Sequence, residues 1–183
     1  IGPFAALGLY ELSRRREKGL KVAWWHIFEI WHSPSLPAIA AMGLALVAIF
    51  IAWLTAAKFI YDATFAPIAP ATLGAFLASL FTTKAGWALI LLGNGVGFLF
   101  AVLVLSLSVV SFPLLLDRPV GVVAAIATSL MCVRRNPVTM AEWGLIVAIG
   151  LVAGSLPFFM GLAFVMPVLG HASWHLYRKA VRV

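Results

Sequence analysis

The chain has 183 residues, of which 63% are hydrophobic and only 10% are charged. Soluble domains are about 45–50% apolar and about 25% charged, so this composition excludes a soluble globular domain. The net charge is +7, but the basic residues lie at the ends of apolar runs, so anionic lipid headgroups rather than nucleic acid are the expected counter-charge. The single cysteine, Cys132, excludes an intrachain disulfide and a cysteine-rich metal or iron–sulfur site.

The chain opens at Ile1 inside an apolar run, without a methionine or the features of a signal peptide. We therefore expect an N-terminally truncated protein whose first helix continues upstream. Residues 18–31 mix aromatic and charged side chains, which is typical of a helix lying in the headgroup region. This stretch is predicted to be an interfacial helix, and its tryptophans are predicted interfacial anchors: Trp24, Trp25 and Trp31.

A helix needs roughly 20 mainly apolar residues to cross a bilayer core of about 30 Å. Two runs meet this requirement directly, 37–60 and 87–110, and the second opens with Trp87, a further predicted anchor. Between them, residues 72–81 carry apolar side chains at helical spacing and predict a second interfacial helix. A third interfacial helix is predicted at 121–133.

The last apolar region, 137–177, is about 40 residues long, and a straight helix of that length would be about twice as long as the hydrocarbon core is thick. It must therefore bend or turn. We predict two spans, 138–153 and 157–177, joined by a turn at Gly154-Ser155-Leu156-Pro157. A single tilted helix kinked at Pro157 is the alternative. The anchors predicted here are Trp143, Trp174 and Tyr177.

Eleven of the thirteen cations fall in three clusters: Arg14, Arg15, Arg16, Lys18 and Lys21; Arg118, Arg134 and Arg135; Arg178, Lys179 and Arg182. The positive-inside rule places these clusters on the cytoplasmic side of a bacterial inner membrane. Two cytoplasmic ends require an even number of crossings. The predicted fold is therefore all-α: one membrane domain over 1–183, a transmembrane bundle of about four spans with interfacial helices.

Small residues recur at helical spacing in two predicted spans. Gly93 and Gly97 are four residues apart, an arrangement that lets helix backbones approach closely, and Asn94 beside them can form a hydrogen bond across such a contact. Gly150 and Gly154 form a second pair of this kind. Whether the Gly93 face packs on its own chain, on a copy or on another subunit stays open.

The ionisable residues lie outside the span interiors. Asp117 and Arg118 directly follow the second span and predict ion pairing at a helix end, for example with Arg134 or Arg178. Proton pumps and ion-coupled transporters normally carry ionisable groups at mid-membrane depth, so this pattern argues against them.

Two histidines provide the only candidate ligands. His171 and His175 are four residues apart, so both imidazoles project from one helix face, a geometry used for zinc or haem. No carboxylate or cysteine completes the set, and hydrogen bonds to headgroups or neighbouring helices are the simpler interpretation. We predict no resident cofactor and no metal, with lipids as the bound molecules.

Several runs resemble domain of unknown function 2189, a family of proteobacterial membrane proteins: 2–11, 81–83, 108–118 and 167–178. The most specific are Leu114-Leu115-Leu116-Asp117-Arg118 and the motif Gly-His-x-x-Trp-His-Leu-Tyr-Arg at 170–178. The resemblance extends over essentially the whole chain. It implies about six membrane helices in the intact protein, and it implies no activity.

No P-loop, dinucleotide fingerprint, His-Glu-x-x-His motif or nucleophile elbow is present, so no enzyme is predicted. The leading hypothesis is an accessory or assembly subunit that packs against a larger respiratory or photosynthetic electron-transfer complex. One alternative is a small transporter or channel, motivated by a faint hairpin repeat and the glycines of the second span. The other is haem or metal binding through His171 and His175.

Overall fold

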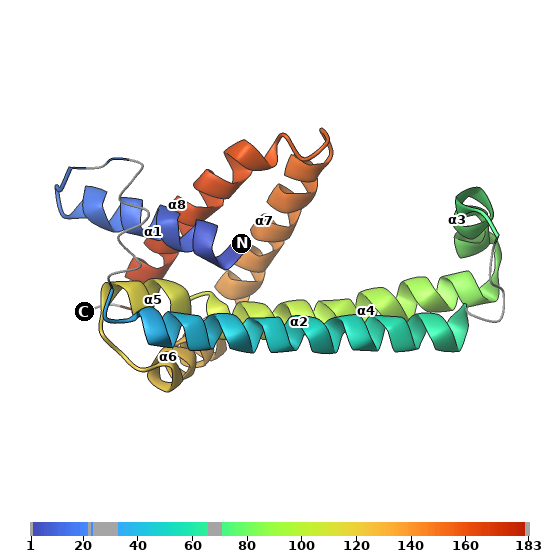
Figure 1. Cartoon of the computed structure of the whole chain (residues 1–183), viewed down its shortest axis with the longest axis horizontal. Helices are drawn as coiled ribbons and strands as arrows, with labels where there is room; N and C mark the ends of the chain where they lie inside the picture. The colour runs from blue at the N-terminus through green and yellow to red at the C-terminus, as the bar shows by residue number, and fades with distance from the viewer. Residues whose placement is uncertain (1, 22, 24–32, 66–70, 182–183) are drawn as a thin grey trace. The chain divides into compact units, whose positions relative to one another are not determined.

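The computed structural model describes residues 2–21, 23, 33–65 and 71–181, and all regular secondary structure in these ranges is helical (Figure 1). The prediction of an all-α fold is confirmed. The chain divides into two compact units: unit 1 comprises Ile1–Leu44 and Leu105–Val183, and unit 2 comprises Ala45–Val104. Two long helices have residues in both units: α2, Leu36–Thr64, and α4, Lys84–Ser108.

Unit 1 is built around a short buried helix, α5, Ser111–Asp117. It packs against α1, Gly2–Glu17, against α6, Val122–Arg135, and against α8, Leu162–Ala180. α8 also packs against α1 and against α7, Pro137–Ser155. Every residue of α5 before Asp117 is buried, so this apolar run is covered by protein rather than by lipid.

A buried serine on α6 stabilises the break between α4 and α5. The break leaves backbone groups without helical partners, which is costly away from water. Ser129 is fully buried, and its hydroxyl donates to the Ser106 carbonyl at 2.7 Å and accepts from the Val110 N–H at 3.3 Å. One side chain thereby satisfies both sides of the break.

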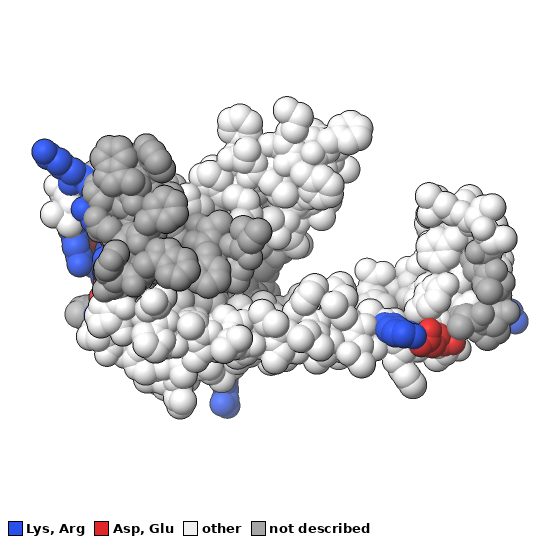
Figure 2. Space-filling view, viewed as in Figure 1, with Lys and Arg blue, Asp and Glu red and all other residues white. Residues whose placement is uncertain are grey.

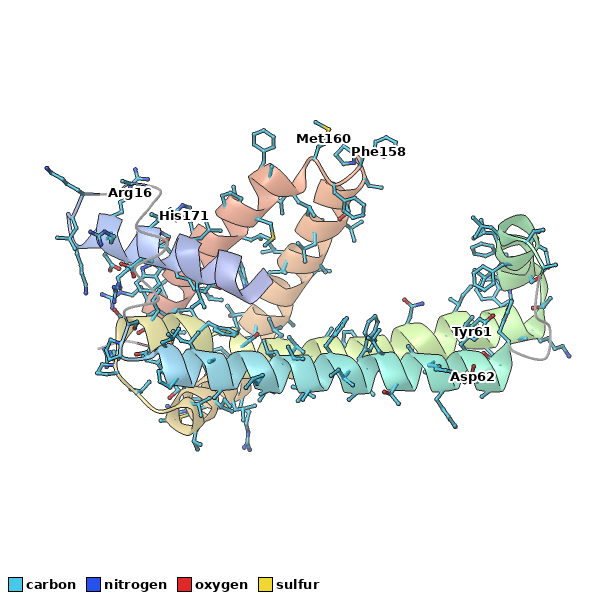
Figure 3. The ribbon with its side chains drawn as sticks, viewed as in Figure 1. Arg16, Tyr61, Asp62, Phe158, Met160 and His171 are labelled. Atoms are coloured by element: carbon cyan, nitrogen blue, oxygen red, sulfur yellow. The ribbon has the colours of Figure 1, made fainter. Side chains whose placement is uncertain are left out.

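For residues 137–177 the sequence allowed either a helical hairpin or one kinked helix. The structure has two helices there, α7 and α8, which pack against each other. The turn lies later than predicted, at 156–161, because α7 continues through Gly154 to Ser155. Phe158 and Phe159 in this turn have φ values of 48° and 65°, a left-handed conformation that costs about 1–2 kcal/mol per residue. Both side chains are largely exposed at the tip, where Figure 3 labels Phe158.

Unit 2 contains residues 45–64 of α2, residues 84–104 of α4 and a connecting helix, α3, Leu73–Thr82. Thr72 caps α3 by accepting from the Ala75 N–H at 3.2 Å. Thr83 ends α3 and accepts from the Gly86 N–H at 3.0 Å at the start of α4. A Cβ on Gly86 would lie 2.4 Å from a backbone carbonyl oxygen of α3, so this corner requires glycine.

Three described stretches are long and apolar enough to cross a membrane: Leu36–Thr64, Lys84–Asp117 and Pro137–Ser155. They contain the first three predicted spans, 37–60, 87–110 and 138–153. α8 holds most of the fourth predicted span, 157–177, but it is not among these stretches. Its C-terminal half is too polar, with two histidines followed by Arg178 and Lys179.

Two of the three predicted interfacial helices coincide with described helices: 72–81 corresponds to α3, and 121–133 corresponds to α6. The predicted helix at 18–31 falls mainly on residues outside the described ranges, as do Trp24, Trp25 and Trp31. Residues 18–21, which are described, form a turn and coil rather than a helix.

Candidate functional site

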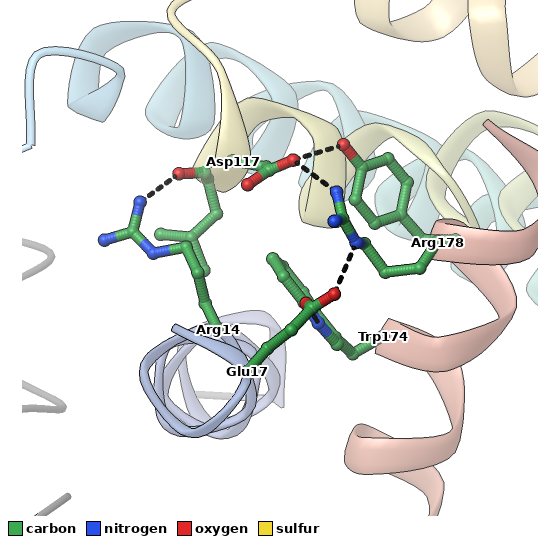
Figure 4. A network of polar contacts seen from close by, with 7 residues as sticks. Arg14, Glu17, Asp117, Trp174 and Arg178 are labelled. Atoms are coloured by element: carbon green, nitrogen blue, oxygen red, sulfur yellow. Dashed lines mark hydrogen bonds and ion pairs between the residues drawn. The ribbon is translucent and has the colours of Figure 1, made fainter. Parts of the chain in front are cut away.

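Unit 1 contains a cluster of polar contacts between the ends of three helices, which we name the polar junction (Figure 4). The last carbonyl groups of a helix lack intrahelical partners and carry the negative end of its dipole, so cations are favoured there. Arg14 Nη1 donates to the Leu116 carbonyl oxygen at 2.8 Å and so caps the C-terminal end of α5 from α1. The other members of the polar junction are Glu17, Asp117, Trp174, Tyr177 and Arg178.

Two carboxylates attach α8 to its neighbours. Glu17 on α1 accepts from Trp174 Nε1 and from Arg178 Nε, each at 3.0 Å. Asp117 on α5 accepts from the Tyr177 hydroxyl at 2.8 Å and from Arg178 Nη1 at 3.4 Å. Desolvation lowers the pKa of Arg178, but its hydrogen bond to Glu17 and the charges of both carboxylates outweigh this and raise it. Arg178 therefore stays charged and bridges α1 and α5.

A further carboxylate of α1 is buried close to the polar junction. The Glu11 side chain is only 2% exposed, and its Oε2 lies 2.7 Å from Arg14 Nη2. Arg15 lies one helical turn after Glu11, and its Nη1 is 3.9 Å from Glu11 Oε1. Because a desolvated carboxylate must be paired with positive charge, Arg14 serves both Glu11 and the end of α5.

Of the predicted helix-end charges, Asp117 meets one of its two predicted partners, while two predicted anchors are buried. The structure pairs Asp117 with Arg178, whereas the Arg118 side chain forms no ion pair within the described part of the chain. Trp174 and Tyr177, predicted at the lipid interface, are each only 1% exposed, with ring centroids 5.5 Å apart. Both can lie inside the protein because carboxylates satisfy their polar ends.

The two remaining described anchors differ in exposure. Trp87 is 50% exposed, and its Nε1 donates to the Phe81 carbonyl at 3.1 Å. Trp143 is half-buried on α7. An exposed indole near the start of α4 is available to headgroups, and Trp87 stays a predicted anchor.

The two histidines have different surroundings. His171 Nδ1 lies 2.6 Å from Ser13 Oγ on α1, while His175 is exposed (His171 is labelled in Figure 3). Within the described ranges, no three His, Cys, Asp or Glu side chains form a group that could hold a metal ion. His171 therefore contributes to the contact between α1 and α8.

The two glycine pairs differ in what faces them. A Cβ on Gly154 would lie 2.8 Å from Leu162 Cδ2, and one on Gly150 would lie 3.4 Å from Val165 Cγ1, so this pair brings α7 close to α8. A Cβ on Gly93 would meet nothing within 4 Å. On Gly97 it would be in ordinary contact with Trp53 Nε1, at 3.7 Å.

Asn94 does not reach another described helix. Its Nδ2 donates to the Ile90 carbonyl at 2.7 Å, within α4 itself, and its side chain is exposed. α4 is also continuous from Lys84 to Ser108, so its glycines do not interrupt the helix. These glycines therefore no longer support the transporter hypothesis.

Sequence reasoning did not single out Glu11, Ser13, Arg14 or Glu17 as contact residues. The sequence did contain one signal for them. The chain has only six acidic residues, so a cationic partner can be sought for each carboxylate. The spacing of Glu11 to Arg14 and Arg15 predicts pairing within one helix. The contacts of Glu17 with α8 had no local indication.

The fold and the polar junction define a polytopic α-helical membrane protein in which polar side chains join helices to one another. The chain belongs to the DUF2189 family, described as predicted integral membrane proteins, and the family model matches residues 1–117. The resemblance at 167–178 lies beyond the matched range. No curated protein and no solved structure matches the chain.

Proposed function

We propose that this protein is a non-catalytic membrane protein that packs against another membrane protein through unit 2, as an accessory or assembly subunit of a larger complex. The main support is Asn94, which is exposed near the middle of α4. Its side-chain carbonyl oxygen and its second N–H have no hydrogen-bond partner among the described residues. The indole N–H of Trp53 on α2 also lacks one there.

Hydrocarbon cannot satisfy these groups. A polar group without a partner in an apolar medium costs free energy, and a hydrogen bond between membrane helices recovers about 0.6–2 kcal/mol of it. Lipid chains can cover the apolar surface of unit 2, but they have no donor or acceptor at this depth. A protein helix can supply one, which favours a protein partner over lipid at this position.

The surroundings of Asn94 and Trp53 can admit such a helix. A groove of about 420 Å³ lies in unit 2 along α2 and α4, and it includes Trp53 and Gly97 among otherwise apolar walls. The space over Gly93 is open, so a partner backbone can approach closely there. Figure 2 shows the middle of α2 and α4 without charged atoms. The expected partner is therefore a transmembrane helix with small residues and one Ser, Thr or Asn.

The test is native electrophoresis and mass determination of the full chain, gently solubilised from its own host membrane. We expect a complex larger than the 19.7 kDa chain. Asn94→Leu should lower the association constant of the complex about threefold to thirtyfold, which corresponds to the loss of one interhelical hydrogen bond of about 0.6–2 kcal/mol. Gly93→Leu should lower it as well, because the added side chain fills the space open to the partner.

Gly95→Leu is the matched control, since an added Cβ there also meets nothing within 4 Å. At 100° per residue it lies on a different side of α4 from Gly93, so the complex should persist. Migration only as a free monomer would overturn the proposal. An assembly containing only copies of this chain would also contradict the accessory role.

We further propose a bacterial inner membrane location with the basic helix ends of unit 1 in the cytoplasm, supported by the positive-inside rule. In a Cys132→Ala background, Arg16→Cys should be labelled by a membrane-impermeant maleimide only after the cytoplasmic face is exposed. Phe158→Cys, at the exposed tip between α7 and α8, should be labelled in intact spheroplasts. The reverse pattern would contradict this orientation.

A further inference from the structure

The described surface of unit 1 contains a groove of about 640 Å³ where the end of α6, the start of α7 and the end of α8 meet. Two cations line it, Arg135 from α6 and Lys179 from α8. Thr139 and Asn136 add polar groups, while Met131 and Leu176 add apolar surface. The groove thus combines positive charge with an apolar wall.

These two cations differ from those of the polar junction. Arg14 and Arg178 are engaged by carboxylates, whereas Arg135 and Lys179 form no ion pair with any described residue. No carboxylate occurs among the residues that line the groove. Burial raises the pKa of the Cys132 thiol in the groove wall, while the charge of Arg135 lowers it in part. The positive charge in the groove is therefore uncompensated within the described chain.

The groove also lies at the level expected for headgroups. α7 is a candidate span that starts at Pro137, so its first turn marks one membrane boundary. The last turns of α6 and α8 at the same place carry basic residues. Basic pockets between membrane helices at such boundaries bind anionic headgroups.

We propose that this groove is a binding site for one anionic phospholipid, with the headgroup phosphate held by Arg135 and Lys179 and an acyl chain along Met131 and Leu176. A free phosphate would use the same cations but would gain nothing from the apolar wall. The proposal is independent of partner binding by unit 2, because every lining residue belongs to unit 1.

The test is native mass spectrometry of the full chain in mild detergent, titrated with phosphatidylglycerol or with phosphatidylcholine of the same acyl chains. Phosphatidylglycerol should bind more tightly, with one lipid retained preferentially. A basic residue near an anionic headgroup contributes about 1 kcal/mol, so Arg135→Gln and Lys179→Gln should each weaken binding about fivefold. The double variant should weaken it about 25-fold. Arg135→Lys should retain most of the affinity because it keeps the charge.

Arg134→Gln is the matched control: it removes the same charge from the adjacent position of α6, but Arg134 does not line the groove. It should leave the affinity within about twofold of the original, as expected for a cation outside the site. Equal weakening by Arg134→Gln and Arg135→Gln would show diffuse surface attraction and overturn the proposal. Competition by inorganic phosphate as strong as by the lipid would also overturn it, because the site would then recognise phosphate alone.

A second measurement uses the only cysteine. Cys132 lines the groove, so bound phosphatidylglycerol should slow its alkylation by a small maleimide, and phosphatidylcholine should not. Circular dichroism of each variant checks that the helices remain folded, as expected for substitutions at exposed positions. Alkylation that is unaffected by phosphatidylglycerol would place the lipid elsewhere.

Discussion

Units 1 and 2 place polar groups among apolar helices in different ways. In unit 1, Glu17 and Asp117 each accept two hydrogen bonds from α8, and the aromatic residues that donate to them are buried. In unit 2, Asn94 bonds only within its own helix, and a groove that includes Trp53 and Gly97 stays open. The polar junction of unit 1 is therefore satisfied by contacts within the unit, whereas Asn94 in unit 2 has polar groups without a partner among the described residues.

The glycine pairs illustrate the same difference. Gly150 and Gly154 face α8, and their missing side chains make close packing possible. Gly93 has the same spacing to Gly97 but faces open space. One sequence pattern thus marks a completed contact in unit 1 and an available surface in unit 2, and substitutions can separate the two cases.

The largest expected effect is on the core of unit 1. Trp174→Ala removes a ring that is 1% exposed and the hydrogen bond to Glu17, so the free energy of unfolding should fall by about 3–5 kcal/mol. Trp87→Ala, at a 50% exposed position, should cost less than about 1 kcal/mol. Thermal unfolding followed by circular dichroism in detergent measures both. Equal effects would mean that unit 1 is no better packed than unit 2.

Alanine at two glycines should have effects of opposite sign. Gly154→Ala should destabilise the protein by about 1–3 kcal/mol, because the Cβ would lie 2.8 Å from Leu162 Cδ2 and 3.2 Å from the Leu162 nitrogen. The Cβ that Gly93→Ala adds would have no neighbour within 4 Å. This substitution should therefore stabilise α4 by up to about 1 kcal/mol, because alanine has the higher helix propensity. Destabilisation by Gly93→Ala in the isolated chain would contradict the open surface described for unit 2.

Much of the fold follows from the sequence, because a span is defined by length and apolarity that are visible in any window. α2, α4 and α7 were predictable on this basis, as were α3 and α6 from helical spacing. α5 was not predicted as a separate helix. The break that separates it from α4 depends on Ser129, which lies 19 residues beyond Val110. The turn between α7 and α8 was predicted at 154–157 but lies at 156–161, because the left-handed conformation of Phe158 and Phe159 has no sequence marker.

The polar junction was only partly predictable for the same reason. Asp117 was recognised as a helix-end charge, but two partners for it were possible. Trp174 and Tyr177 were recognised as amphipathic side chains, but both were assigned to the lipid interface. Their contacts join residues 60 and 157 positions apart in the chain. Only tertiary packing determines whether such an aromatic residue meets a headgroup or a carboxylate.

A smaller effect is expected for a single hydroxyl group. Tyr177→Phe removes the donor to Asp117, whose side chain is only 12% exposed, so the free energy of unfolding should fall by about 1.5–3 kcal/mol. Tyr61→Phe in unit 2 is the control, because Tyr61, labelled in Figure 3, is 37% exposed. Its ring centroid lies 6.0 Å from that of Phe65. It should change stability by less than about 0.5 kcal/mol. A similar loss for both variants would show that the Asp117 contact contributes nothing specific.

The smallest effect is expected at the exposed ion pair of α2. Lys58 and Asp62 are one turn apart and have side chains 75% and 49% exposed, so Lys58→Gln should cost at most about 0.5 kcal/mol, and salt should reduce even that. Arg178→Gln in unit 1 should cost more, because Arg178 connects two helices to α8 while Lys58 connects none. Denaturation of both variants at low and high salt measures this difference. If Lys58→Gln costs as much as Arg178→Gln, local charge pairing rather than the joining of helices determines the stability of the polar junction.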